Sequence, residues 1–167
     1  MKNFFLPCIA LLGMVSFSSC ESNDGVSAKA EGTYITNRKT EINKELSPSQ
    51  FASFNVNMVE ADVKLQIKAV SDQFIEITLP STLFTGMGVP MEIPSITVPN
   101  VPVLDGGDGD VDIVPYTYDD KEKGVFVMLS GEIEDDGDID LKTTVKYGKM
   151  PLFLNQEYYT PYDEPQI

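Results

Sequence analysis

The sequence predicts an all-β domain, an antiparallel up-and-down meander of about eight strands that either closes into a barrel or folds into a β-sandwich. Three observations support this prediction. Apolar and polar residues alternate with a period of two along much of the chain after Thr33, which is typical of strands with one buried face. Connections between consecutive strand candidates are short, which implies antiparallel neighbours. No segment is long enough for a helix that could cross over a parallel sheet.

The alternation is clearest near residue 63 and near residue 143. In the first segment five apolar residues are expected to face the core: Val59, Ala61, Val63, Leu65 and Ile67. In the second segment the inward-facing set is Ile139, Leu141, Thr143, Val145 and Tyr147. Strands are expected at residues 33–43, 58–70, 73–80, 87–99, 110–119, 124–134, 138–148 and 151–159.

Turn and breaker residues agree with this layout. Asp135-Asp136-Gly137, between two apolar runs, predicts a hairpin turn. Ser47 could cap a short helix, with Pro48 at its first position and one or two turns over residues 50–54. Prolines recur through residues 87–103, and each withholds a backbone donor from an otherwise apolar run. We expect that strand at a sheet edge or bulge, where a barrel could stay incompletely closed.

The first residues predict export. Lys2 gives a positive start, and residues 4–15 form an apolar stretch with the length of a signal peptide rather than the about 20 residues that span a bilayer. Residues 17–20, Phe-Ser-Ser-Cys, resemble a lipobox, so we expect cleavage after Ser19 and lipid attachment to Cys20. The alternatives are an ordinary cleavage site or an unpaired thiol. Acyl chains on Cys20 would hold the protein on a membrane.

These features divide the chain into three parts. Residues 1–19 are the expected signal peptide, residues 20–32 are polar and small and predict a flexible tether, and residues 33–167 form one domain of ordinary size.

The layout resembles the calycin-like lipoproteins of Bacteroidetes. The resemblance rests on the lipobox, the opening Glu-Gly-Thr-Tyr of residues 31–34, the Met-Gly-Val-Pro-Met-Glu-Ile-Pro of residues 87–94 and the late Leu-Ser-Gly-Glu-Ile of residues 129–133. It implies a lipocalin-like, eight-stranded antiparallel barrel and a family without an assigned function. Glu21 and Asp24 resemble the signal that exports such lipoproteins to the outside of the outer membrane. The 44–57 insertion and the Asp/Gly tract at 105–112 depart from the pattern.

Composition excludes several functions. The net charge is -14, and loss of the signal peptide removes one lysine and no acidic residue, so nucleic acid and anionic lipid head groups would be repelled. The chain has no histidine, which rules out histidine-based triads and histidine-ligated metals. Cys20 is the only cysteine after signal removal, so no intrachain disulfide forms. No nucleophile or phosphate-loop motif is present, and we expect no enzyme activity.

One acidic tract could bind a hard cation. Four carboxylates lie within eight residues on a glycine-rich segment, a composition that suits calcium: Asp105, Asp108, Asp110 and Asp112. The tract lacks the complete EF-hand pattern, and a solvated loop between strands is the favoured interpretation. A second cluster, Glu134, Asp135, Asp136, Asp138 and Asp140, is expected to face solvent. Apart from calcium, no cofactor is expected.

Methionines and aromatic residues suggest a ligand cavity. Four of them are candidates to line it: Met58, Met91, Phe126 and Met128. The alternative is a filled core, because an eight-stranded barrel is just wide enough for side chains to fill. The sequence therefore favours a non-catalytic envelope lipoprotein that binds a small apolar ligand or an envelope protein. A structural or adhesive module is the second candidate, and a carboxylate-dependent hydrolase is the third.

Overall fold

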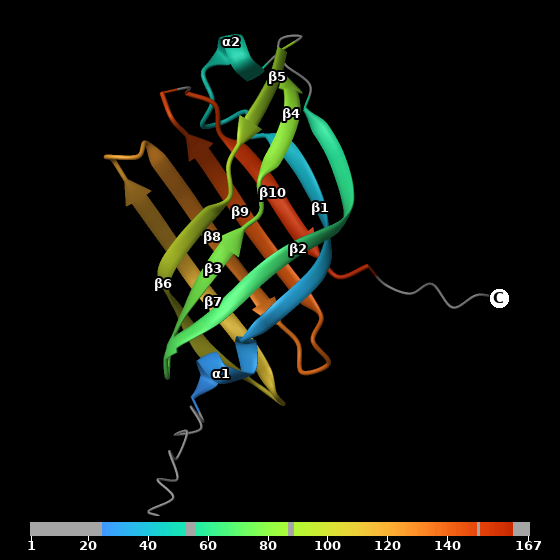
Figure 1. Cartoon of the computed structure of the whole chain (residues 1–167), viewed down its shortest axis with the longest axis vertical. Helices are drawn as coiled ribbons and strands as arrows, with labels where there is room; N and C mark the ends of the chain where they lie inside the picture. Colours follow the sequence, from blue (N-terminus) through green and yellow to red (C-terminus); the bar gives the residue numbers. More distant parts are fainter. Residues whose placement is uncertain (1–24, 53–55, 87–88, 150, 162–167) are drawn as a thin grey trace, which may run out of the picture.

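A computed structural model describes residues 25–52, 56–86, 89–149 and 151–161. Eight antiparallel strands form a closed barrel in the order β1-β10-β9-β8-β7-β6-β3-β2 (Figure 1). The barrel strands are β1 (Gly32–Ile42), β2 (Asn57–Ser71), β3 (Phe74–Leu79), β6 (Ile96–Gly107), β7 (Asp110–Asp120), β8 (Val125–Ile133), β9 (Ile139–Tyr147) and β10 (Leu154–Tyr159). The predicted barrel is confirmed, and the sandwich alternative is excluded.

The two ends of the barrel differ. At one end lie the short helix α1 (Val26–Ala30) and the β2–β3, β6–β7 and β8–β9 turns (Figure 1). We call it the α1 end. The opposite end carries α2 (Ser49–Ala52) and a separate two-stranded sheet of β4 (Thr82–Gly86) and β5 (Val89–Ile93), and we call it the hairpin end. None of the described helices is long and apolar enough to span a membrane.

The single strand expected at residues 87–99 is wrong. The segment divides at Pro94 and Ser95 into β5, which pairs with β4, and β6, which enters the barrel. β6 extends further than predicted, to Gly107, so the Asp/Gly tract is a tight hairpin turn rather than a long loop. Asp108 and Gly109 occupy that turn with φ values of 53° and 109°.

β6 pairs with β3 over residues 96–102 and with β7 over residues 103–107. The β6–β7 register runs from Gly107↔Asp110 to Val103↔Ile113, whereas β3 pairs with β6 as far as Ile96. Pro99 and Pro102 on β6 and Pro115 on β7 lack the backbone donor that a continued ladder would need. The barrel is nevertheless closed, so the expectation of incomplete closure at the proline-rich strand is wrong, and only the β6–β7 ladder stops short of the hairpin end.

β2 carries a bulge that reverses its side-chain pattern. Asp62 has a φ of 57°, and the β1–β2 register shifts between Thr36 and Arg38. Beyond the bulge Leu65 and Ile67 face the core as predicted, but Val59 is 64% exposed and Ala61 is also exposed. The predicted burial of Val59 and Ala61 is wrong, because an inserted residue moves the preceding positions to the other face.

The predicted tether of residues 20–32 overlaps with folded structure. Residues 25–32 are folded: Ser27 and Ala30 are fully buried, and the Ser27 amide donates to the Asp72 carbonyl oxygen at 3.2 Å. The Tyr34 hydroxyl donates to the Ala30 carbonyl oxygen at 2.8 Å. The prediction of a flexible tether through residue 32 is wrong for this part, since α1 packs on the barrel end and buries small side chains there.

Candidate functional site

The most apolar hollow described lies under the β4–β5 sheet, at the hairpin end. It has a volume of about 290 Å³, and we call it the hairpin pocket. Its lining is mainly apolar, with one acidic and one basic side chain: Phe84, Met91, Glu92, Ile93, Tyr147, Lys149, Leu152 and Leu154.

Strand alternation places the lining residues. Phe84 pairs with Met91 across the β4–β5 sheet, so both side chains share the face turned toward the barrel, whereas Leu83 on the other face is 61% exposed. Leu152 and Leu154, 8% and 0% exposed, close the pocket from the side of β10.

A second hollow adjoins the hairpin pocket. This side cleft has a volume of about 450 Å³ and lies where β6 and β7 no longer pair. Residues from the β5–β6 connection, β6, β7, the β7–β8 turn, β8 and β9 line it: Pro94, Ser95, Ile96, Thr97, Tyr118, Lys123, Val125 and Tyr147. Tyr147 lines both hollows, so its side chain lies between them.

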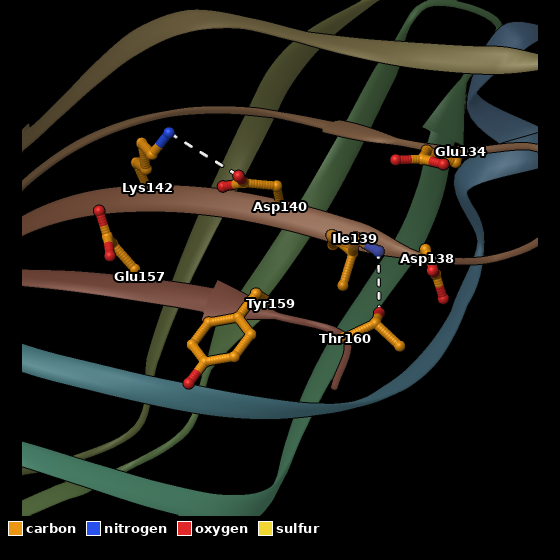
Figure 2. A pocket seen from close by; sticks show the side chains of 8 residues that line it. All are labelled: Glu134, Asp138, Ile139, Asp140, Lys142, Glu157, Tyr159 and Thr160. Carbon is orange, nitrogen blue, oxygen red and sulfur yellow. Dashed lines mark hydrogen bonds and ion pairs between the residues drawn. The ribbon is translucent and has the colours of Figure 1, made fainter. Parts of the chain in front are cut away.

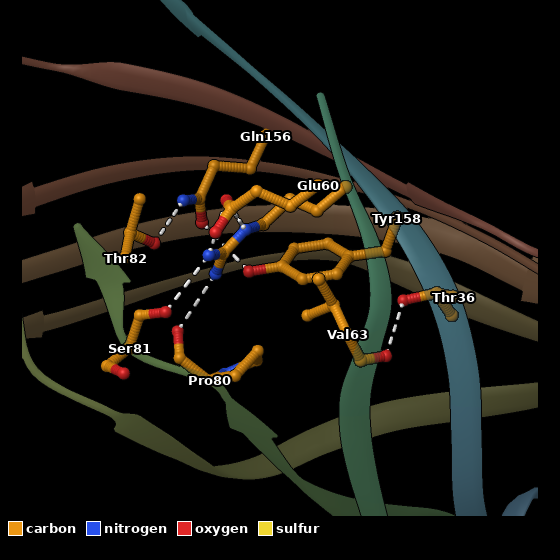
Figure 3. Close-up of polar contacts among 9 residues, drawn as sticks. Thr36, Glu60, Val63, Pro80, Ser81, Thr82, Gln156 and Tyr158 are labelled. Carbon is orange, nitrogen blue, oxygen red and sulfur yellow. Dashed lines mark hydrogen bonds and ion pairs between the residues drawn. The ribbon is translucent and has the colours of Figure 1, made fainter. Parts of the chain in front are cut away.

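Inside the barrel, next to the hairpin base, lies a buried arginine. Arg38, 1% exposed, lies on β1 directly between Glu60 on β2 and Tyr158 on β10. Its guanidinium donates to Glu60 Oε2 from Nε and Nη2, at 2.9 and 2.7 Å, and lies 5.8 Å from the centre of the Tyr158 ring. Its other contacts are the carbonyl oxygens of Pro80 and Ser81, at 3.1 and 3.0 Å (Figure 3).

This polar cluster connects the barrel to the base of the hairpin. Pro80 and Ser81 immediately precede β4, so Arg38 holds the point where the chain leaves the barrel. Gln156 Nε2 donates to Thr82 Oγ1 at 2.7 Å, and the Tyr158 hydroxyl donates to Gln156 Oε1 at 2.9 Å. Burial raises the pKa of Tyr158 to about 12, although the adjacent guanidinium acts in the opposite direction. The neutral phenol is therefore a stable hydrogen-bond donor.

Two buried hydroxyl groups lie in the same layer. Thr40 and Thr143 flank Gln156 in the register of β1, β10 and β9. Their side-chain oxygens are buried and have no hydrogen-bond partner among the described residues. Such groups are rare in protein interiors and are commonly satisfied by water or a ligand. Leu154, two residues from Gln156, separates this layer from the hairpin pocket.

The four predicted cavity residues separate into two groups. Met91 lines the hairpin pocket, and Met58 packs against the core at the hairpin end of β2. Phe126 and Met128 lie on the outer face of β8, alternating with the buried Val125, Val127 and Leu129. Their predicted place inside the cavity is wrong, because the β8 register turns the smaller residues inward. Phe126 instead contacts Phe153 edge to face, with ring centres 5.8 Å apart.

The predicted calcium ligands lie at the α1 end, on the β6–β7 hairpin. Asp105 accepts the Gly107 amide at 3.2 Å and lies 3.7 Å from Lys29 Nζ, while Asp110 accepts the Asp135 amide at 3.0 Å. Among the described residues no three carboxylates are grouped so that they could hold a metal ion. Calcium binding by Asp105, Asp108, Asp110 and Asp112 therefore has no geometric support here and stays a prediction.

The second acidic cluster borders a polar hollow of about 300 Å³. Glu134, Asp138, Asp140, Lys142, Glu157 and Tyr159 line it with Ile139 and Thr160 (Figure 2). Partial desolvation raises the pKa of Glu134, and neighbouring carboxylates including Asp136 and Asp138 add to the effect. Glu134 is nevertheless exposed, so it lacks the apolar surroundings that give a general acid its raised pKa in hydrolases. The arrangement is a solvated acidic surface.

Cys20 and the signal peptide lie outside the described residues, so lipidation stays a prediction. Arg38 and Glu60 are the main residues that sequence reasoning missed. The sequence analysis assigned no facing to the first strand, so nothing marked Arg38 as buried, and the place of Glu60 beside it depends on the bulge at Asp62.

No family model matches the sequence, and no curated protein matches it. The structure resembles a crystal structure of a protein from Bacteroides fragilis described as a "putative outer membrane protein", with a TM-score of 0.55 and 21% sequence identity. The match covers 82% of this chain and 52% of the other, so this chain spans about half the length of that protein. At this identity the likeness shows a shared fold. The resemblance to the calycin-like family stays a prediction, whereas the barrel that it implies is confirmed.

Proposed function

We propose that this chain is a non-catalytic, lipid-anchored protein of the cell envelope, whose barrel binds a small apolar or amphipathic ligand in the hairpin pocket. The observation that carries the proposal is the pocket itself: five buried or half-buried apolar side chains surround a hollow of about 290 Å³, near the lower limit for small-molecule sites. The fold shared with a Bacteroides fragilis protein described as an outer membrane protein supports the envelope location.

The pocket favours a ligand with one charged or polar group. Lys149 and Glu92 stand at its margin, and Lys123 lies beyond Tyr147 in the side cleft. The apolar walls would take a narrow hydrocarbon portion, and the polar group would remain at the opening. Such a division of contacts is typical of sites that fix the orientation of an apolar ligand with a few polar groups.

Binding of a fluorescent fatty-acid analogue tests the ligand proposal. We expect saturable binding by the soluble domain, residues 25–167, and at least a tenfold weaker affinity in Met91→Trp, because the indole would fill the pocket. Leu83→Trp is the matched control, since Leu83 lies on the opposite, exposed face of the same β4–β5 sheet, and it should bind like the unmodified domain. Absence of saturable binding, or unchanged affinity in Met91→Trp, would contradict the proposal.

Lipid anchoring has a separate test. The full chain made in a bacterial host should float with membranes in a density gradient, and mass spectrometry of its N-terminal peptide should show acyl chains on Cys20. Cys20→Ser should remain in the soluble fraction. A floating Cys20→Ser protein would contradict the proposed anchor.

A surface interaction module is the second candidate, because apolar side chains are exposed at the hairpin end. Leu83 and Val89, 61% and 59% exposed, lie on the β4–β5 sheet, and Val59 and Leu46 are also exposed at this end. This candidate predicts that photocrosslinking in intact cells from a residue beside Leu83 gives a discrete protein adduct, which Leu83→Lys with Val89→Lys removes. An adduct unchanged in that variant would exclude this surface.

A further inference from the structure

A second apolar surface lies at the α1 end, beside the first described residue. Val70, Phe74 and Leu104 are 51%, 41% and 54% exposed. Phe74 pairs with Pro102, and Leu104 lies two residues further along β6 on the same outward face. Val70 flanks the other side of the β2–β3 turn. We call these three residues the apolar corner.

The chain enters the domain next to this corner. Gly25 lies against Asp72 in the β2–β3 turn: a Cβ on Gly25 would be 2.5 Å from Asp72 Cα. The Ser27 hydroxyl donates to the Ser71 carbonyl oxygen, and Ala69 donates its amide to Glu31 Oε2 at 3.0 Å. These contacts fix the entry point to the same turn that carries Val70 and Phe74.

The length of chain before Gly25 limits the position of the domain. Four residues lie between Cys20 and Gly25, and the five Cα-to-Cα steps reach about 18 Å when fully extended. An 11-residue strand such as β1 is about 35 Å long. A barrel tilt of about 40° reduces this length to a height of about 27 Å between the two ends. A lipid on Cys20 therefore brings the apolar corner within reach of the bilayer and leaves the hairpin end beyond it.

We propose that the apolar corner rests on the lipid surface that holds the anchor, so that the hairpin pocket opens away from that bilayer. This inference rests on the proposed lipidation of Cys20. Three apolar side chains beside a covalent anchor are suited to the interface, where apolar groups enter the boundary between head groups and acyl chains. The pocket then receives its ligand from the aqueous phase rather than from the bilayer that holds the anchor.

The surrounding charges favour a neutral lipid surface. Lys29 lies 3.7 Å from Asp105, next to Leu104, and Lys68 is exposed near the end of β2. The acidic β6–β7 and β8–β9 turns lie at the same end of the barrel and would be repelled by anionic head groups. Contact should therefore be closer on neutral bilayers than on anionic ones.

The chain contains no tryptophan, so the fluorescence of a single introduced tryptophan reports on contact with lipid at that position alone. Phe74→Trp in the lipidated full chain introduces one tryptophan into the corner, and Leu83→Trp introduces one at the exposed hairpin end as the control. In vesicles of brominated phosphatidylcholine, which quenches tryptophan at close range, we expect emission from Phe74→Trp to fall at least twofold and that from Leu83→Trp to stay constant. Replacing part of the lipid with phosphatidylglycerol should weaken the quenching.

Each outcome decides one point. A protein that floats with vesicles but shows equal quenching at both positions, or stronger quenching at position 83, overturns the inference and leaves the anchor intact. A protein that does not float overturns both the anchor and the inference. Ligand binding is measured on the soluble domain without vesicles, so its failure is separate from either result.

Discussion

At the scale of single residues, Arg38 determines how the barrel interior is organised. Its guanidinium is removed from water and receives one carboxylate, two carbonyl oxygens and an aromatic face as partners. An ion pair buried in this way contributes little to stability compared with an apolar pair of similar volume, but removal of one member leaves the other without a partner. The cluster instead favours one arrangement of the fold, because it links β1, β2 and β10 to the hairpin base.

Arg38→Met should therefore lower the free energy of unfolding by about 1–3 kcal/mol, since two carbonyl groups and the partly exposed Glu60 carboxylate lose their donor. The double variant Arg38→Met with Glu60→Met should lose less than the sum of the two single variants, because neither charge is then left alone. Urea unfolding followed by circular dichroism measures all four proteins. Additive losses would show that the two side chains do not interact.

Tyr158 predicts how stability changes at alkaline pH. Burial raises the pKa of its phenol from 10.0 to about 12. Between these values the unfolded chain releases the proton and the folded chain keeps it, so unfolding is favoured as the pH rises. The loss of folding stability from this ionisation is absent below pH 10 and reaches about 2–3 kcal/mol near pH 12.

The corresponding measurement is the free energy of unfolding in urea at pH 9 and at pH 11.5. Tyr158→Phe should be less stable than the unmodified domain at pH 9, because Gln156 Oε1 loses its donor. The difference in free energy of unfolding between the two proteins should be smaller at pH 11.5. A constant gap would mean that the phenol ionises equally in both states.

At the scale of secondary-structure elements, alternation identified most barrel strands because each has one buried and one solvated face. The predicted alternation failed at the point where β2 contains one inserted residue. The bulge at Asp62 turned Glu60 inward and Val59 outward, and a period-two pattern contains no mark of such an insertion. The β4–β5 sheet was missed for another reason: its inward face packs on the mouth of the barrel, a contact between distant segments.

The candidate site was less predictable than the fold. Met91 was identified because methionine suits apolar cavities, but the same reasoning included Met128, which lies on the outer face of β8. Residue type alone does not determine which side chains of a strand point inward. The pocket also depends on the relative placement of β4, β5 and the β9–β10 turn.

Gly131 tests how closely β8 and β9 pack. It pairs with Leu141, and a Cβ there would lie 2.2 Å from the Asp140 carbonyl oxygen and 2.9 Å from the Leu141 Cα. Both atoms belong to the backbone, so no side chain can move aside. Gly131→Ala should lower the free energy of unfolding by about 1–3 kcal/mol or more.

Ser130→Ala is the matched control for this substitution, because Ser130 is the neighbouring residue and points outward. We expect its effect to stay within about 0.5 kcal/mol. Thermal unfolding of the three proteins at equal concentration measures the difference. Equal stability of both variants would show that the two strands separate at little cost.

At the scale of the whole molecule, charge is distributed unevenly along the barrel axis. Residues 105–112 contain four acidic side chains and residues 132–140 contain six, and both turns lie at the α1 end. Asp112 and Glu132 are directly opposite each other in the β7–β8 register. Two exposed ion pairs lie nearby, Lys29 with Asp105 and Lys142 with Asp140, each with a distance of 3.7 Å between nitrogen and oxygen. Like charges at this density oppose folding, and salt reduces their repulsion.

Sodium chloride should therefore raise the melting temperature of the domain, and calcium should add no more than magnesium does at equal ionic strength. Screening depends on ion charge, whereas a calcium site would prefer the larger ion with its flexible coordination. Calorimetry in the three salts makes the comparison. A larger shift with calcium that disappears in Asp108→Ala with Asp110→Ala would instead establish a calcium site in the β6–β7 turn, whose Asp105 and Asp112 would then have to move toward the ion.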